Sequence, residues 1–160
     1  MSLRYLRLYR DELKTSSVTR LSEDIVSDTH KSIRESVIES LKTSGFAKEF
    51  IRRYMEKNAS DVEGLVRARF LKTVLGLGVD KNSIDSRILA GVEKAIEVLR
   101  DYLLNKLLII GGSGIVVVVR KKILYNNVVY RSGDVCVMDL ETAVIMHMLG
   151  YVEPIRIDIV

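Results

Sequence analysis

The sequence predicts an α+β fold in which an all-helical bundle comes first and a small β-rich domain comes last. Three observations carry this prediction. Up to about residue 108, apolar residues such as Val92, Ile96 and Leu99 recur every three or four positions, the spacing of an amphipathic helix. A glycine-rich segment then interrupts the pattern at residues 111–114. Immediately after it, residues 115–119 form a continuous β-branched run, which favours a strand.

The glycine-rich segment is predicted to separate two domains. Glycine and serine have little side chain to pack and broad backbone freedom, so residues 111–114 suit a linker. The expected organisation is a helical domain at 1–110 and a β domain at 115–160.

Five helical stretches are expected in the first domain. Ser22 is a predicted N-cap because acidic residues follow it, and Asn58 signals the end of a short helix. The spacing of Ser60 and Glu63 matches a capping box and predicts a new helix start. The expected helices cover about residues 3–14, 23–44, 46–57, 61–75 and 84–108.

Short strands and turns are expected in the second domain. Asn126 and Asn127 separate two apolar runs and predict a two-residue hairpin, because asparagine tolerates the left-handed conformation that such turns need. A turn at 131–134, a strand at 135–138, a helix at 141–149 closed by Gly150, and a last strand at 155–159 complete the prediction.

Charge and composition limit the classes of protein that fit. The formal net charge is +4, with 20 basic and 16 acidic residues up to residue 110 and five of each afterwards. Mixed charges of this kind are typical of solvated helix faces rather than of a dedicated nucleic-acid surface. Lys106 and the glycines interrupt the apolar stretch 103–119, so no membrane span is expected. The absence of glutamine together with many charged residues is typical of proteins from hot environments.

The residues give little sign of catalysis. Cys136 is the single cysteine and no leader-like segment opens the chain, so a reducing, cytoplasmic compartment is expected. His30 and His147 have no metal-ligand spacing to other donors, and the glycines follow helices rather than precede them. No enzyme activity, cofactor or metal is therefore predicted. A small hydrolase would need His30 or His147 to meet an acid in one pocket.

A basic helical nucleic-acid-binding protein is the main alternative that the residues leave open. Several cations on the helices could reach phosphates, although two or three per helix give only weak, salt-sensitive binding. Two tyrosines in the predicted hairpin could stack bases. The candidate contacts are Arg52, Arg53, Arg67, Arg69 and Lys72, with Tyr125 and Tyr130 in the hairpin.

Three passages resemble a known family. Residues 21–26 stand where that family begins its second helix, and residues 65–74 are similar to its Arg-x-x-Lys helix. Residues 130–137, with Ala143, Gly150 and Glu153 beyond them, follow its β-domain order of aromatic, Gly-Asp, strand, helix, glycine and strand. The whole chain resembles a subunit of GINS, the tetrameric complex that accompanies the replicative helicase in archaea and eukaryotes. It is similar to the archaeal class in which the helical domain precedes the β domain.

The resemblance implies a non-catalytic role in DNA replication. A GINS subunit pairs with a paralogous chain in a hetero-tetramer of two chain types, and the family associates with the MCM helicase and a Cdc45/RecJ-like protein. Primase is a further partner in some archaea, and the expected location is the cytoplasm at the nucleoid. Little or no direct DNA binding and no membrane contact are expected.

Specific residues follow from joining the resemblance to the apolar pattern. The second and last helices are expected to pack against sister subunits, while the β domain recruits a further partner. The predicted subunit interface comprises Ile33, Val37, Leu41, Leu99, Leu103 and Leu107. The predicted partner surface of the β domain comprises Tyr125, Tyr130 and Tyr151.

Overall fold

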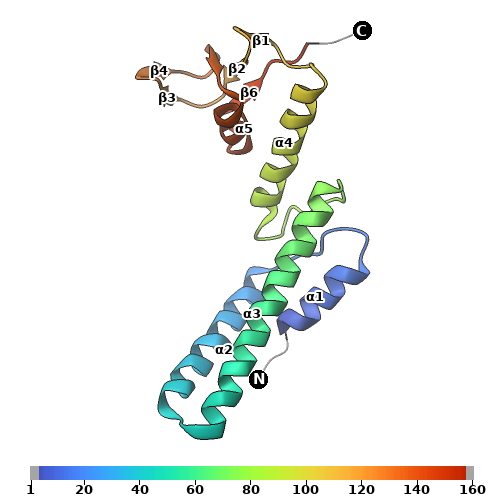
Figure 1. The fold of residues 1–160 in the computed structure, drawn as a ribbon, viewed down its shortest axis with the longest axis vertical. Helices are drawn as coiled ribbons and strands as arrows, with labels where there is room; N and C mark the ends of the chain where they lie inside the picture. The colour runs from blue at the N-terminus through green and yellow to red at the C-terminus, as the bar shows by residue number, and fades with distance from the viewer. Residues whose placement is uncertain (1–3, 158–160) are drawn as a thin grey trace. The chain divides into compact units, whose positions relative to one another are not determined.

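The computed structural model describes residues 4–157 and confirms the α+β class, with helices first and a small antiparallel β region last (Figure 1). The chain divides into two compact units, residues 1–89 and residues 90–160. We call them the helical unit and the β unit. Among the described residues, no helix combines the length and the apolar character needed to cross a membrane.

The helical unit is built around one long helix. It contains α1 (Arg4–Lys14), α2 (Glu23–Lys42), α3 (Gly45–Val74) and the first residues of α4 (Ser86–Leu103). Figure 1 shows α3 running back along α2 after a short turn, with α1 beside α3. Both α1 and α2 therefore depend on α3 for their burial.

The predicted break in the third helical stretch is wrong. Residues 45–74 form a single helix of 30 residues, in which Asn58 is a buried interior position and Ser60 is exposed. Ile51, Asn58, Leu65 and Lys72 are all buried and lie seven residues apart. A seven-residue repeat keeps these positions on one side of a helix over several turns. Burial of this side stabilises the helix, so the helix continues past Asn58 and Ser60 despite their local signals for a helix end and a helix start.

The side of α2 that is buried carries small polar residues. Its buried positions are Thr29 and Ser36, whose hydroxyls donate to the carbonyl oxygens of Ile25 at 2.6 Å and of Ser32 at 2.9 Å. Each buried hydroxyl is thus satisfied within its own helix, as buried polar groups require. Ile33, which lies between them on the same side, is half-buried, while Val37, Ile38 and Leu41 are exposed.

The loops of the helical unit also pair with each other. The backbone N–H of Val18 donates to the carbonyl oxygen of Gly78 at 3.1 Å, and that of Ile84 donates to Leu21 at 3.0 Å. The segment between α1 and α2 is therefore fastened to the segment between α3 and α4. These hydrogen bonds join the two loops near the C-terminal end of α3.

The β unit has one central strand. β2 (Gly114–Val119) pairs with β5 (Val135–Met138) on one side and with β1 (Ile109–Ile110) and β6 (Val152–Pro154) on the other, all antiparallel. β3 (Ile123–Tyr125) and β4 (Val128–Tyr130) form a two-stranded sheet of their own. The predicted hairpin turn is confirmed, because Asn126 and Asn127 both have positive φ angles, of 49° and 61°.

The core of the β unit uses helices as well as strands. α4 contributes Val98, and α5 (Leu140–Met148) contributes Ala143, which pack with Val117 and Met138 of the sheet. Asp139 caps α5, since its carboxylate accepts from the backbone N–H of Thr142 at 2.8 Å. Leu149 is the C-cap of α5, and Gly150 follows it with a φ of 72°, so the predicted glycine stop lies one residue beyond the cap.

The predicted linker at 111–114 is corrected to a hairpin turn. Gly111 and Gly112 have φ angles of 65° and 86° and join β1 to β2 within the β unit. The last helix ends at Leu103 rather than near residue 108, because residues 107–110 belong to the β core and to β1. The final strand also differs: β6 includes Pro154, and residues 158 and 159 of the predicted strand lie outside the described part of the chain.

Candidate functional site

The predicted interface positions on α2 form an uncovered stripe. Ile33, Val37 and Leu41 are spaced four residues apart, which places them along one side of a helix. Within the unit Ile33 is half-buried, while Val37 is 36% exposed and Leu41 is 79% exposed. The stripe therefore becomes more exposed toward the turn between α2 and α3.

Two phenylalanines follow the same turn. Phe46 is 87% exposed and Phe50 is 54% exposed, on the first two turns of α3. Aromatic side chains bury large areas when they pack, so leaving two of them in water is unfavourable. The end of the α2–α3 hairpin is thus apolar on both helices. We call Ile33, Val37, Leu41, Phe46 and Phe50 the hairpin-end patch.

A second apolar stripe runs along α3. Val66, Phe70 and Val74 recur every four residues and are 47%, 39% and 53% exposed. Exposed apolar side chains are common when scattered, but a contiguous series marks an interaction surface. The sequence shows these residues as an apolar stripe at helical spacing, but nothing local separates a buried stripe from an uncovered one.

Of the five cations predicted to contact nucleic acid, three lie on the surface and already have acidic partners. Arg52 binds Glu49 at 2.8 Å, Arg53 binds the same carboxylate at 3.0 Å, and Arg67 binds Glu63. The hydrogen bond from Arg52, followed by that from Arg53, lowers the pKa of Glu49 to about 2. The local field of these cations is therefore largely balanced by acids on the same helix.

The other two predicted contacts, Arg69 and Lys72, are corrected to buried structural residues. Arg69 is only 2% exposed, and its guanidinium lies 2.8 Å from the carboxylate of Asp85 and 2.9 Å from that of Glu12. It also donates to the hydroxyl of Ser83 at 2.9 Å. The N–H donors of Arg69 are therefore used by groups inside the protein and are not free to bind a phosphate.

Lys72 completes the same cluster. Its ammonium lies 2.9 Å from a carboxylate oxygen of Glu12 and donates to the hydroxyl of Thr15 and the carbonyl oxygen of Ser17, each at 2.9 Å. The Arg-x-x-Lys pattern of α3 thus joins α1, the loop after it and the loop before α4. Sequence reasoning missed Glu12 and Asp85, whose partners lie 57 and 16 residues away along the chain.

Both acids of this cluster are held in their charged form. Burial is the largest influence on the pKa of Glu12 and would raise it, but hydrogen bonds from Thr19 and Lys72 and the charge of Arg69 outweigh it. For Asp85, burial likewise opposes ionisation, and the hydrogen bonds from Arg69 and Ser83 reverse its effect. The pKa of each acid lies below its ordinary value.

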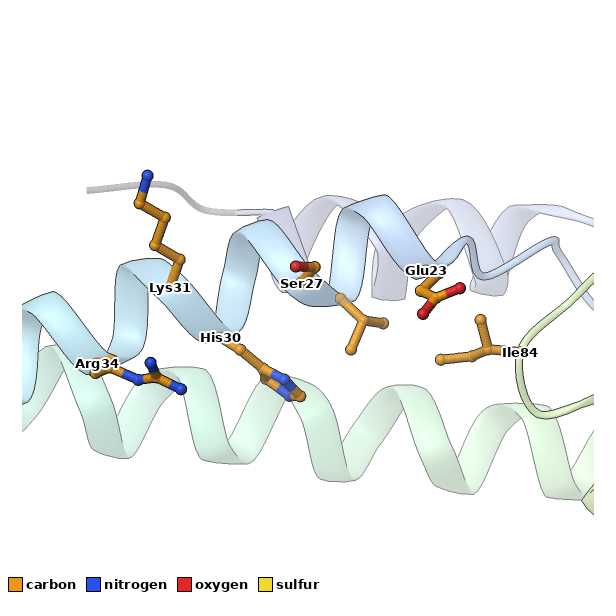
Figure 2. Close-up of a pocket in the computed structure, with 7 residues that line it drawn as sticks. Glu23, Ser27, His30, Lys31, Arg34 and Ile84 are labelled. Atoms are coloured by element: carbon orange, nitrogen blue, oxygen red, sulfur yellow. The ribbon is translucent and has the colours of Figure 1, made fainter.

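A surface hollow of about 780 Å³ lies beside α2. Figure 2 shows that Glu23, Ser27, His30, Lys31 and Arg34 come from α2 and that Ile84 comes from the loop before α4. In that view Lys31 points away from the side on which His30 and Arg34 lie. The lining mixes acid, base and aliphatic residues, which suits contact with a protein surface better than capture of one charged group.

The histidines do not meet other metal ligands. Among residues 4–157, no group of three or more His, Cys, Asp or Glu side chains could hold a metal ion. His30 lines the hollow just described, whereas His147 is 9% exposed and its Nδ1 lies 3.0 Å from the carbonyl oxygen of Val152. His147 therefore fastens α5 to β6.

The predicted interface positions near the end of α4 separate into two kinds. Leu99 and Leu103 are 43% and 82% exposed, in keeping with a surface role. Leu107 is 1% exposed and belongs to the core of the β unit, so its assignment to an interface is corrected.

The predicted tyrosine surface of the β unit also divides. Tyr125 and Tyr130 are half-buried and pack against the core, while Tyr151 is 36% exposed with the ammonium of Lys121 5.3 Å from its ring centre. The rings of Tyr125 and Tyr130 are thus used inside the unit. A partner surface on the hairpin must lie on its other face.

No protein-family model matches this sequence, and a search of curated proteins finds no significant match.

Proposed function

We propose that this chain is a non-catalytic subunit of a GINS-type complex, which uses binding energy to hold replication proteins together. The observation that carries the proposal is the hairpin-end patch. An α-helical hairpin that leaves large apolar side chains such as Leu41 and Phe46 exposed is what an assembly subunit requires.

The cluster around Arg69 supports the same proposal. Its charges fix α1 and both loops onto the C-terminal half of α3 from the inside, while Val66 and Phe70 on the same half of α3 stay exposed. A preorganised surface loses less entropy on binding than a flexible one. The stretch that resembles the Arg-x-x-Lys helix of the GINS family therefore has a structural use in this chain.

The proposed partners are those that the resemblance implies. A paralogous chain of the opposite domain order would cover the hairpin-end patch and form the hetero-tetramer. The β unit would then meet the MCM helicase or the Cdc45/RecJ-like protein, with primase as a further contact. The location would be the cytoplasm, at the nucleoid of an archaeon.

Co-expression with the paralogous chain from the same genome tests the proposal. We expect the two chains to co-purify with a mass of two copies of each, measured by native mass spectrometry. Leu41→Glu should abolish this assembly, because it places a charge within the patch. Leu13→Glu should leave it intact, since Leu13 is similarly exposed, at 60%, but lies on α1.

If the chain were a stable monomer that does not bind the paralogous chain, the proposal would be contradicted. The nucleic-acid alternative makes a different prediction, because a dedicated binder shows affinity for DNA that falls steeply with salt. The pairing of Arg52, Arg53 and Arg67 with acids on their own helix argues against that outcome.

A further inference from the structure

The outer face of the β3–β4 hairpin combines two apolar side chains with two cations. Leu124 pairs with Val129 across the hairpin, and the two are 69% and 52% exposed. Side chains alternate between the faces of a strand. Leu124 and Val129 therefore share the face opposite to that of Ile123, which is buried in the core.

Two cations flank the last pair of the hairpin. Lys122 precedes Ile123 and Arg131 follows Tyr130, so a continuation of the register by one residue sets them opposite each other on the face of Leu124 and Val129. Both are exposed. We call Lys122, Leu124, Val129 and Arg131 the hairpin face.

Among residues 4–157, neither cation has an acidic partner, whereas the two cations just before Lys122 each have a partner in the β unit. Arg120 binds Glu153, and Lys121 lies over the ring of Tyr151. Asp134, the acid nearest to Arg131 in the sequence, accepts from the backbone N–H of Arg131 at 2.6 Å instead of pairing with the guanidinium. Like charges directly opposite each other destabilise a strand pair, so this arrangement favours an added acid.

We propose that the hairpin face binds an extended acidic segment of a partner protein, in which an apolar residue and an acidic residue are two positions apart. Strands β3 and β4 pair with each other and with no other strand of the described chain, so each has an edge where a further strand can be added. Along β4 such a strand sets its apolar residue beside Val129 and its acid beside Arg131. Along β3 the same pattern matches Leu124 and Lys122.

A peptide fits this face better than a nucleic acid does. Single strands of DNA or RNA are held by aromatic stacking beside a basic groove. Tyr125 and Tyr130, the aromatic residues of the hairpin, pack against the core on the opposite face. The exposed face has aliphatic side chains in the positions where stacking rings would be needed. The inference stands whether or not the chain is a GINS subunit.

Fluorescence anisotropy with the full-length chain tests the proposal. The probe is a capped, fluorescein-labelled nonapeptide with valine and glutamate alternating on one face and threonine at the remaining positions. We expect saturable binding at low salt, and loss of binding when lysine replaces glutamate in the peptide.

Two matched pairs of variants locate the site. Lys122→Glu should weaken binding about threefold to fivefold or more, whereas Lys121→Glu, with the same change of charge one residue away, should stay within about twofold. Val129→Thr should weaken binding, while Val128→Thr should not, although Val128 is 50% exposed on the neighbouring position of the same strand.

Three outcomes would overturn the proposal. The first is no binding of the glutamate peptide at millimolar concentration, and the second is an equal effect of both members of either variant pair. The third is binding of a labelled oligothymidylate that Lys122→Glu abolishes while the glutamate peptide fails to bind. In that case the hairpin would be a nucleic-acid surface.

Discussion

At the scale of single residues, the position of Arg69 decides how α3 is interpreted. In the sequence Arg67 and Arg69 are two cations of one basic stretch, but the first has a side chain that is 78% exposed and the second is almost fully buried. A buried charge is tolerated only when paired groups replace its hydration. Glu12, Asp85, Ser83 and Thr19 are the groups that do so here.

Replacing these two arginines should have very different effects on stability. Arg69→Met leaves the carboxylates of Glu12 and Asp85 buried with less compensation, and should lower the free energy of unfolding of the helical unit by about 3–5 kcal/mol. Arg67→Met removes one exposed ion pair and should change it by less than about 1 kcal/mol. Urea unfolding followed by circular dichroism measures both. Equal effects would show that the buried cluster does not stabilise the unit.

The same cluster predicts a dependence on pH. The folded pKa of Glu12 lies below its unfolded value of about 4.3, so its contribution to stability is complete above that value. The contribution is lost as the pH falls through the folded pKa. The free energy of unfolding should therefore decrease progressively below about pH 5, and less steeply in Glu12→Gln.

Glu63→Gln is the control for this measurement. Glu63 also pairs with an arginine, but 62% of its side chain is exposed. Its replacement should leave the slope of stability against pH close to that of the unmodified chain. A steep slope that survives in Glu12→Gln would assign the acid sensitivity to other groups.

At the scale of elements, a local start signal and a true cap can be told apart. Ser60 has the sequence of a capping box but is an exposed position inside α3, whereas Asp139 caps α5 through its bond to Thr142. Ser60→Ala should thus leave the helical unit unchanged or stabilise it by up to about 0.5 kcal/mol, because alanine is the better helix former. Asp139→Ala should destabilise the β unit by about 1 kcal/mol. Thermal unfolding of the two variants tests this; a loss on Ser60→Ala would indicate a break in α3.

Sequence patterns succeeded where the signal is local. The Asn126–Asn127 turn, the strand after it and the helix closed by Gly150 depend on residues within a few positions of one another, and these predictions are confirmed. The class of fold follows from the change of period, which is also local.

Predictions failed where burial by residues far away in the sequence determines the local structure. Asn58 would end an isolated helix, but in α3 it belongs to a side buried over four heptad positions. Residues 107–110 continue an apolar pattern and yet leave the helix, because β2 offers them a strand to pair with. The sequence likewise predicts that Arg69 and Lys72 are exposed to solvent, because their partners lie in loops that only the folded chain brings next to α3.

At the scale of the whole molecule, the boundary between the units defines which parts fold together. The core of the β unit includes Val98 of α4 and Leu107 of the connection after it, and Arg156 binds Asp101 at 2.7 Å. A fragment of residues 115–160 keeps Arg156 but lacks Val98, Asp101 and Leu107. The boundary at residue 90 therefore keeps the core whole, whereas a cut at the glycine turn divides it.

Expression of two fragments tests this boundary. Residues 90–160 should give dispersed amide resonances and cooperative unfolding, because the fragment keeps every residue of that core. Residues 115–160 should remain unfolded, since small units need most of their apolar surface buried to be stable.

A matched pair of leucine variants in the longer fragment separates core from surface. Leu107→Ala should cost about 2–5 kcal/mol by opening a cavity in the core, and Leu103→Ala should cost little because its side chain is 82% exposed. If the shorter fragment unfolded as cooperatively as the longer one, the glycine turn would be the true boundary. The end of α4 would then belong to an interface with other chains rather than to the core of the β unit.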